Sequence, residues 1–492
     1  MKKCLTIIAV TLIITALVSV SVSAAINFDA EQIDNFIEEE MSISRIPGLA
    51  LGIVYNGEVI YLKGHGSAGK IRNVSVQTPF IIGSVSKSFT ALAVMQLAEE
   101  GRLELDKPVQ EYLPWFTMAG EYDAGDITVR HLLVQTSGIP NEAGVTSLAH
   151  SSLLNIEEEV RALSSVCLAG KPGERYIYSN ANYIILGLLV DVLSDSGYAD
   201  HIRDNIFNPL GMTSSFLTRG EGMAAGMSDG HTQFIGFPLG GEVQYLDSAL
   251  AAGFIISTAE DMCRYLLMHL GGGSYNGNRL LSEAGLAQLY KPGEVREGEN
   301  LYAMGLVAVE DQAGTLIMHD GMTQGFNSGM VFSPEERWGV IVLTNIGTML
   351  ELPAMPLALA VADLIRGETP DTGSKVSRAF YLGILALMLV LLILTVRSLI
   401  LLPGRWAQRI KTEFPRGLLS LLLHLVMPVL LEVMLPLIIF IIIPAGAGFP
   451  VWRLLGLYHP DLVWGLLILS ALLLVKAAWR ALIFCRLKMQ SK

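Results

Sequence analysis

The chain has 492 residues and a formal net charge of −12, with 51% hydrophobic and only 16% charged residues. This charged fraction is low for a purely soluble protein, so the composition predicts membrane segments. The negative balance argues against nucleic acid as a partner, because a phosphate backbone is bound by basic surfaces.

The N-terminus has the pattern of a secretory signal. Lys2 and Lys3 precede an apolar run, and Val22-Ser23-Ala24 provides small residues for cleavage. We therefore predict a signal peptide over residues 1–24 and an exported domain over residues 25–366. An uncleaved anchor helix is the alternative interpretation, and it also places the domain outside the cytoplasm.

The exported domain begins and ends in predicted strands. The stretch GLALGIVYNGEVIYLKGHGSAG (48–69) predicts two strands, because Asn56-Gly57 favours a tight hairpin turn. Three further strands are predicted at 315–321, 328–336 and 337–345. Between these ends, apolar residues recur with helical spacing in SFTALAVMQLAEEG, NYIILGLLVDVLS and AEDMCRYLLMHLGGG. This order predicts an α+β fold, in which an antiparallel sheet is flanked by helices and a cleft forms where the two meet.

Ser84 and Lys87 form an S-x-x-K pattern in front of a helix predicted from Phe89 to Glu100, which Gly101 would end. A serine hydroxyl is a weak nucleophile until a neighbour takes its proton. A lysine in apolar surroundings has a lowered pKa and can accept that proton. Alternatively, Ser84 caps the helix and Lys87 reaches solvent. Ser67-Ala68-Gly69-Lys70 also fits the pattern, but it lies in a glycine-rich turn with no helix predicted behind it.

Tyr178-Ser179-Asn180 is the only Y-x-N sequence of the chain. A tyrosine hydroxyl near a lysine can relay protons, and an asparagine amide can hold a substrate amide or orient the lysine. The alternative is a loop tyrosine followed by an asparagine that caps a helix.

His319-Asp320-Gly321 lies on a predicted strand. A glycine there would let a substrate lie close along the strand edge. The backbone N–H of Met322 could then form an oxyanion hole with the N–H of Ser84. The similar sequence His269-Leu270-Gly271 ends a predicted helix, so its glycine is interpreted as a C-cap.

Taken in this order, S-x-x-K, Y-x-N and H-x-G resemble the motifs of penicillin-recognising serine hydrolases of the class C β-lactamase type. The phrases LDKPVQEYLP, ITVRHLLVQTSGIP, NPLGMTSSF and AGFIISTAEDM match as well, so the similarity covers residues 30–365. The resemblance implies the β-lactamase/penicillin-binding-protein fold, with a helical domain over the active site. It implies Ser84 as the acylated nucleophile, Lys87 and Tyr178 as its general-base partners, and Asn180 and His319 along the cleft. Which of Lys87 and Tyr178 takes the proton stays open.

Two positions depart from the β-lactamase pattern, which usually has lysine in place of His319 and a small polar residue in place of Asp320. A largely neutral histidine supplies no fixed cation for a substrate carboxylate, and the charge of Asp320 would repel one. We therefore expect a peptidase or amidase of the D-amino-acid or acyl-peptide type, or an esterase, whose leaving part is neutral or cationic. A His319 kept protonated by Asp320 would remove this argument, and β-lactamase activity is the alternative.

The last part of the chain predicts three transmembrane helices over residues 379–492, after a polar linker at 367–378. The spans are placed at 379–396, within 417–444, and at 462–475. Lys and Arg are concentrated in the first connecting loop and in the tail, and such loops face the cytoplasm. The catalytic domain is therefore predicted on the extracytoplasmic side of the cell membrane.

Two ionisable residues, Glu432 and His424, fall in the second span. They are candidates for function, or else Glu432 packs between helices and His424 lies outside the apolar core. The three-span tail is similar to that of a membrane-anchored subset of the family, which includes the peptidase that removes an N-acyl-D-asparagine group from colibactin.

We predict a membrane-anchored serine hydrolase with a small-molecule or peptide substrate and with membrane lipid around its tail. No cofactor and no metal are predicted, because the four cysteines form no zinc cluster. Cys167 and Cys263 could pair. The alternative function is a penicillin-binding sensor or anchor that is acylated at Ser84 but does not turn over.

Overall fold

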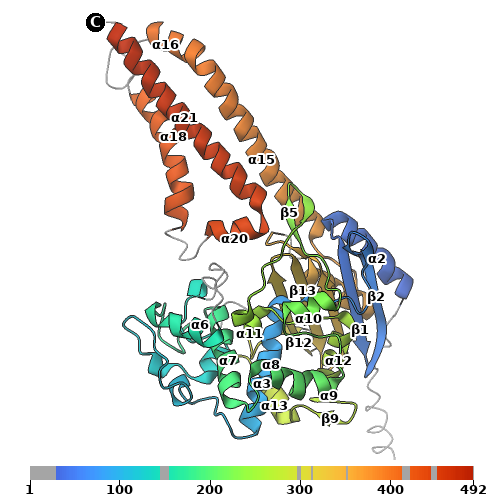
Figure 1. Cartoon of the computed structure of the whole chain (residues 1–492). Coiled ribbons are helices and arrows are strands. Elements are labelled where there is room, and N and C mark those ends of the chain that lie inside the picture. The colour runs from blue at the N-terminus through green and yellow to red at the C-terminus, as the bar shows by residue number, and fades with distance from the viewer. Residues whose placement is uncertain are drawn as a thin grey trace, which may run out of the picture.

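The computed structural model describes residues 29–143, 155–295, 301–311, 314–350, 353–412, 422–444 and 451–490. The predicted signal peptide lies outside these residues. An α+β domain comes first, and long C-terminal helices extend away from it (Figure 1). The predicted fold class of the exported domain is confirmed.

An eight-stranded sheet with the order β10-β11-β12-β13-β14-β1-β2-β3 forms the centre of the domain. Strand β1 (Gly48–Tyr55) pairs antiparallel with β14 (Trp338–Thr344), so the two ends of the domain meet inside the sheet. On its other side β1 pairs with β2 (Glu58–Gly69), through a turn in which Asn56 and Gly57 have φ angles of 48° and 89°. The other strands of this sheet are β3 (Arg72–Asn73), β10 (Leu301–Tyr302), β11 (Val307–Asp311), β12 (Gly314–Thr323) and β13 (Phe326–Ser333).

Helices cover both faces of this sheet. On one face, α2 (Ala30–Ser44) and α14 (Ala354–Arg366) pack on Leu49, Leu51 and Ile53 of β1. On the other face, α3 (Ser86–Glu99) and α12 (Ala259–Leu270) belong to a core that includes Ala50 and Val54. Strand β1 is therefore apolar without interruption, because neither of its faces meets water.

The remaining elements of the domain are short, apart from α7. The helices are α4 (Val129–Leu133), α6 (Ile156–Ala162), α7 (Asn180–Leu193), α8 (Tyr198–Ile202), α9 (Asn208–Leu210), α10 (Arg219–Ala224), α11 (Leu250–Gly253) and α13 (Glu283–Tyr290). The small sheets consist of β4 (Phe80–Ile81) with β7 (Ile256–Ser257), of β15 (Ile346–Gly347), β5 (His231–Phe234) and β6 (Phe237–Gly240), and of β8 (Ser274–Tyr275) with β9 (Asn278–Arg279).

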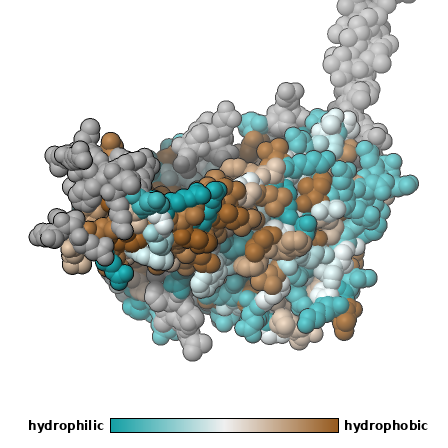
Figure 2. Space-filling view, turned by 90° about the horizontal axis from the view of Figure 1, so that it is seen from above, coloured by the Kyte–Doolittle hydropathy of each residue, from teal (hydrophilic) through white to brown (hydrophobic). Residues whose placement is uncertain are grey.

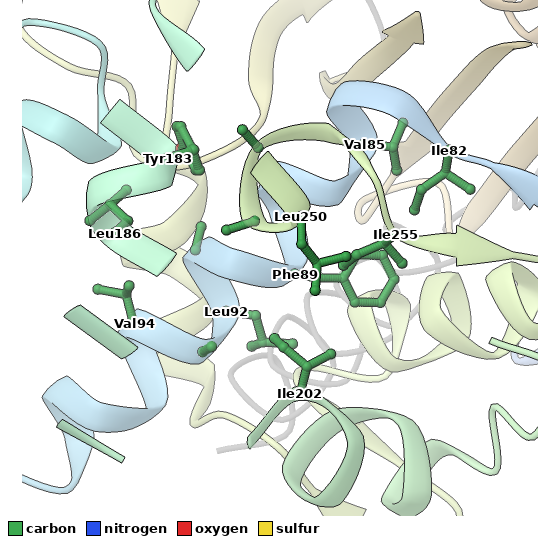
Figure 3. Close-up of a cluster of buried hydrophobic side chains, with 14 of the residues drawn as sticks. Ile82, Val85, Phe89, Leu92, Val94, Tyr183, Leu186, Ile202, Leu250 and Ile255 are labelled. Carbon is green, nitrogen blue, oxygen red and sulfur yellow. The ribbon is translucent and has the colours of Figure 1, made fainter. Parts of the chain in front are cut away.

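Helix α3 is enclosed on all sides, and every residue from Ser86 to Leu97 is buried or nearly so. Figure 3 shows α3 side chains interleaved with those of neighbouring helices; the labelled residues are Ile82, Val85, Phe89, Leu92, Val94, Tyr183, Leu186, Ile202, Leu250 and Ile255. The helix starts at Ser86, earlier than predicted, and a 3₁₀ turn at Gly83–Val85 precedes it. Ser84 lies in that turn, so the interpretation of Ser84 as the helix cap is wrong.

The C-terminal helices are α15 (Ser374–Leu401), α16 (Ala407–Thr412), α18 (Met427–Leu437), α20 (Val451–Tyr458) and α21 (Pro460–Gln490). Among the described residues, two helices are long and apolar enough to cross a membrane, Ser374–Trp406 and Pro460–Leu487. Two of the three predicted spans thus coincide with candidate membrane helices, whereas the second, within 417–444, falls partly outside the described residues. The middle helix, Met427–Ile442, is shorter and carries Pro436 in its interior, and its last turn is π-helical.

The polar linker is shorter than predicted, because α15 already begins at Ser374. Glu432 is buried and accepts a hydrogen bond of 2.8 Å from Arg480, with Lys476 Nζ at 3.1 Å. These contacts favour the interpretation that Glu432 packs between helices. The side chain of His424 is not among the described parts of the structure. Cys167 and Cys263 are both free thiols and do not pair.

Candidate active site

The turn that carries Ser84 lies directly against strand β12. A Cβ atom placed on Gly83 would lie 2.5 Å from Met322 N, and one placed on Gly321 would lie 2.1 Å from Ile82 O. Neither position leaves room for a side chain. We predicted from the sequence that Gly321 leaves space for a substrate, but in the structure the Ile82 backbone occupies the space next to its Cα atom. Gly321 therefore serves to hold the Ser84 turn against β12.

Three predicted catalytic side chains come together at Ser84. Lys87 Nζ lies 2.9 Å from Ser84 Oγ, and the Tyr178 hydroxyl donates a hydrogen bond of 2.9 Å to the same oxygen. Lys87 Nζ also donates to Asn180 Oδ1 at 2.7 Å and to the carbonyl of Ala252 at 2.6 Å. Asn180 thus orients the lysine, one of the two roles predicted for it.

The position of the Ala252 carbonyl follows from the packing of α11 on α3. Thr90 donates a hydrogen bond of 2.7 Å to the Ala251 carbonyl, and Ile255 N donates one of 3.1 Å to Ser86 Oγ. These bonds fix both sides of the Ala252 peptide. No side chain carries this acceptor, so the sequence offered no signal for it.

A separate network holds the Y-x-N segment in place. Gln135 Oε1 accepts hydrogen bonds from Ser179 N at 2.9 Å and from Asn182 Nδ2 at 2.5 Å. Ser179 Oγ donates to the Pro140 carbonyl at 3.0 Å. All three polar side chains are fully buried, where hydrogen bonds between side chains are strong and favour one geometry. Tyr178 is therefore presented to Ser84 by a rigid start of α7.

Lys87 is fully buried, and this burial lowers its pKa to about 7. The negative charge of Asp320 raises the pKa and opposes only part of the effect. The alternative interpretation, in which Lys87 reaches solvent, is excluded. A substantial share of the molecules therefore holds an uncharged amine next to Ser84 at neutral pH.

Burial raises the pKa of Tyr178 above its ordinary value, so the phenol keeps its proton at neutral pH. Its ring lies 5.0 Å from Lys87 Nζ, and it packs edge-on against Tyr302 with 5.9 Å between the ring centroids. Tyr178 is thus arranged as a donor to Ser84 Oγ.

His319 is 3% exposed, and burial lowers its pKa, although the charge of Asp320 opposes this. Its Nδ1 donates to the Asp320 carbonyl at 2.5 Å, and its Nε2 lies 3.3 Å from the Tyr302 hydroxyl. The ring is therefore neutral at neutral pH, and it supplies no fixed cation. Together with Tyr176 and Tyr302 it lines a cavity.

The Ser84 pocket contains the predicted residues Asn180 and Met322. Sequence reasoning missed its other lining residues, which are Gln244, Ala249, Ala252, Gly253, Phe254, Thr323, Gln324, Leu457 and Tyr458. Strand β11 pairs with β12 only as far as Met318. From His319 onward, the edge of β12 that would face β11 is therefore not paired with that strand. Within the described ranges, no group of three or more His, Cys, Asp or Glu residues could hold a metal ion.

Comparisons with known proteins agree with this arrangement. The Beta-lactamase family matches residues 33–362. "Protein flp" of Staphylococcus aureus (strain MRSA252) is 29% identical over 325 residues, which cover 65% of this chain and 64% of that protein. The match thus spans just under two thirds of the length of this curated relative.

Solved structures show the same fold. The octameric penicillin-binding protein homologue from Pyrococcus abyssi is 27% identical, with a TM-score of 0.60 over 70% of this chain and 78% of its own. A class C beta-lactamase has a TM-score of 0.58 at 21% identity, over 68% of this chain and 95% of its own, and at that identity it supports the fold alone. Because the family match extends over most of the described α+β domain, this chain belongs to the beta-lactamase family of serine hydrolases.

Proposed function

We propose that this chain is a membrane-anchored, extracytoplasmic serine hydrolase that acts through an acyl-enzyme on Ser84. The observation that carries the proposal is the position of Ser84 Oγ, which lies 2.9 Å from both Lys87 Nζ and the Tyr178 hydroxyl. A nucleophile, a buried amine and a phenol at such distances form an acyl-transfer site.

The partners of Lys87 favour it as the proton acceptor. A neutral amine has two N–H groups, and Asn180 Oδ1 and the Ala252 carbonyl can take both. Its lone pair then faces Ser84 Oγ. The Ser84 proton moves to Lys87, and Oγ bonds to the substrate carbonyl carbon while the C=O electron pair moves to oxygen.

The negative oxygen of this intermediate lies next to the backbone N–H groups of Ser84 and Met322 in our proposal. The close approach of Gly83 to Met322 N supports this placement. When the intermediate collapses, the leaving nitrogen or oxygen takes the proton from Lys87, directly or through Tyr178. Water then attacks the ester on Ser84, giving the acid and free enzyme.

His319 and Asp320 support a substrate whose leaving part is neutral or cationic. The neutral ring of His319 offers no ion pair to a carboxylate. Asp320, the next residue on β12, is exposed, and its negative charge would repel a carboxylate. We propose an amidase, peptidase or esterase of this selectivity. Peptides with a free or an amidated C-terminus should therefore differ, with the amidated form hydrolysed faster.

The apolar exterior of the C-terminal helices supports membrane anchoring. Leu387, Leu389 and Ile400 on α15 are all more than half exposed. Figure 2 looks down on this side of the molecule, where hydrophobic residues form a broad band and hydrophilic residues dominate towards the right of the view. The β5–β6 hairpin next to α15 and α21 also exposes Phe237 and Leu239. Such surfaces are stable against lipid.

A screen of D-amino-acid amides, acylated peptides and simple esters with the full-length protein tests this function. We expect turnover that disappears in Ser84→Ala. Labelling of Ser84 without turnover would favour a sensor instead. Turnover confined to β-lactams would show that the proposed selectivity is wrong.

A further inference from the structure

Two residues that line the Ser84 pocket come from the C-terminal helices. Leu457 and Tyr458 form the end of α20 (Val451–Tyr458), well beyond residue 362, where the family match ends. Helix α20 lies between the long C-terminal helices and the α+β domain (Figure 1). The pocket is therefore completed by a segment outside the domain that carries Ser84, Lys87 and Tyr178.

The end of α20 is anchored to the α+β domain by buried hydrogen bonds. His459 is fully buried, and Met349 N donates to its Nε2 at 3.3 Å. Burial lowers the pKa of His459 to about 4, so the ring is neutral and can accept this bond. Asp461 Oδ2 accepts from Ile235 N at 2.9 Å and from the Tyr381 hydroxyl at 2.5 Å. These contacts fix Leu457 and Tyr458 relative to the pocket.

One segment, β15 and the residues directly after it, contacts both His459 at the end of α20 and strand β12. Strand β15 (Ile346–Gly347) leads to Met349, and a Cβ atom on Gly347 would lie 2.4 Å from Thr323 O. Thr323 follows Met322 on β12 and lines the same pocket. The Ser84 turn, the end of β12, β15 and the end of α20 are thus connected by successive contacts.

The pocket is small and largely apolar. Its free volume is about 50 Å³, room for only a few water molecules. Ala249, Phe254 and Leu457 contribute apolar walls, and Tyr458 is 5% exposed. No charged side chain is among the residues that line it in the described parts of the chain. The pocket therefore restricts both the size and the charge of what it admits.

We propose that α20 is part of the active site and that Leu457 and Tyr458 determine substrate specificity by admitting small, uncharged acyl groups. This inference rests on the proposed acyl-enzyme. The acyl part stays bonded to Ser84 after the leaving group departs, so it is the part that must fit against the pocket walls that include Leu457 and Tyr458. A larger residue at position 457 narrows the pocket, and a smaller one widens it.

The test compares 4-nitrophenyl acetate with 4-nitrophenyl octanoate, using the full-length protein in detergent. Wild type should prefer the acetate. Leu457→Ala should raise the octanoate-to-acetate ratio of kcat/KM about 10-fold, and Leu457→Phe should lower it. Leu455→Ala is the matched control, since Leu455 lies on the same helix but is not among the pocket residues. It should leave the ratio unchanged.

The ratio is taken within each variant, so a loss of folded protein cancels. Ser84-dependent cleavage of both esters with the same ratio in Leu457→Ala, Leu457→Phe and Leu455→Ala would overturn the inference and leave the proposed function standing. If neither ester reacts in a Ser84-dependent way in any variant, the acyl-enzyme itself is wrong and the inference falls with it.

Discussion

The pH dependence of Ser84 acylation tests the role assigned to Lys87. Burial lowers the pKa of this lysine from the ordinary value of 10.5 to about 7. At pH 7 roughly half of the molecules then hold a neutral amine, against about one in 3,000 for an unperturbed lysine. The shift corresponds to about 5 kcal/mol acting against the protonated form. It makes the base available without alkaline conditions.

The assay is the pre-steady-state burst of 4-nitrophenol from 4-nitrophenyl acetate between pH 5 and pH 9, with Ser84→Ala as the blank. Only the deprotonated amine accepts the serine proton, so the acylation rate should rise about tenfold per pH unit well below pH 7 and level off above it. Because the charge of Asp320 raises the Lys87 pKa, Asp320→Asn should move the midpoint to lower pH. A rate that is flat from pH 5 to pH 9, or an Asp320→Asn midpoint at higher pH, would refute this reasoning.

Three other substitutions test separate parts of the structure. Tyr178→Phe removes the hydroxyl 2.9 Å from Ser84 Oγ. It should slow the burst about 100-fold and leave the denaturant midpoint nearly unchanged; a burst of normal rate would exclude Tyr178 from proton transfer. Gly321→Ala places a Cβ atom 2.1 Å from Ile82 O and should cost about 1–3 kcal/mol in urea unfolding. Its control Gly241→Ala, where the added atom meets nothing within 4 Å, should cost less than about 0.5 kcal/mol, and equal costs would contradict the close packing of β12. Glu432→Gln leaves the cations of the buried Arg480 and the partly buried Lys476 without their anion. It should lower the free energy of unfolding by about 3 kcal/mol, which is measured as a lower Tm in detergent. An unchanged Tm would mean that the ion pairs contribute no stability.

The sequence was sufficient for five strands of the central sheet and for the three motifs, because local rules govern them, but it did not predict β3, β10 and β11. The Asn56-Gly57 turn, the alternation of strands and the helical spacing around α3 each act over a few residues. The joining of β1 to β14 also followed, since apolar strands at both ends of a domain need partners. Ser84, Lys87 and Tyr178 meet as the motif order suggested.

Long-range packing set the features that the sequence did not reveal. The Ala252 carbonyl that holds Lys87 is backbone, so no residue type marks it. The reason for Gly321 is the Ile82 backbone, which is far away in the chain. The entry of α20 into the pocket depends on His459 and Asp461, whose partners lie far away in the chain, just after β15, in the turn between β5 and β6, and on α15.

Mass spectrometry of the trapped covalent intermediate tests the central claim most directly. The full-length protein is mixed with an ester it cleaves, quenched in acid within the burst, digested and sequenced by fragmentation. The acyl mass should be found on Ser84 in wild type, and its yield should fall strongly in Lys87→Met. An acyl group on another residue, or an undiminished adduct on Ser84 in Lys87→Met, would contradict the account.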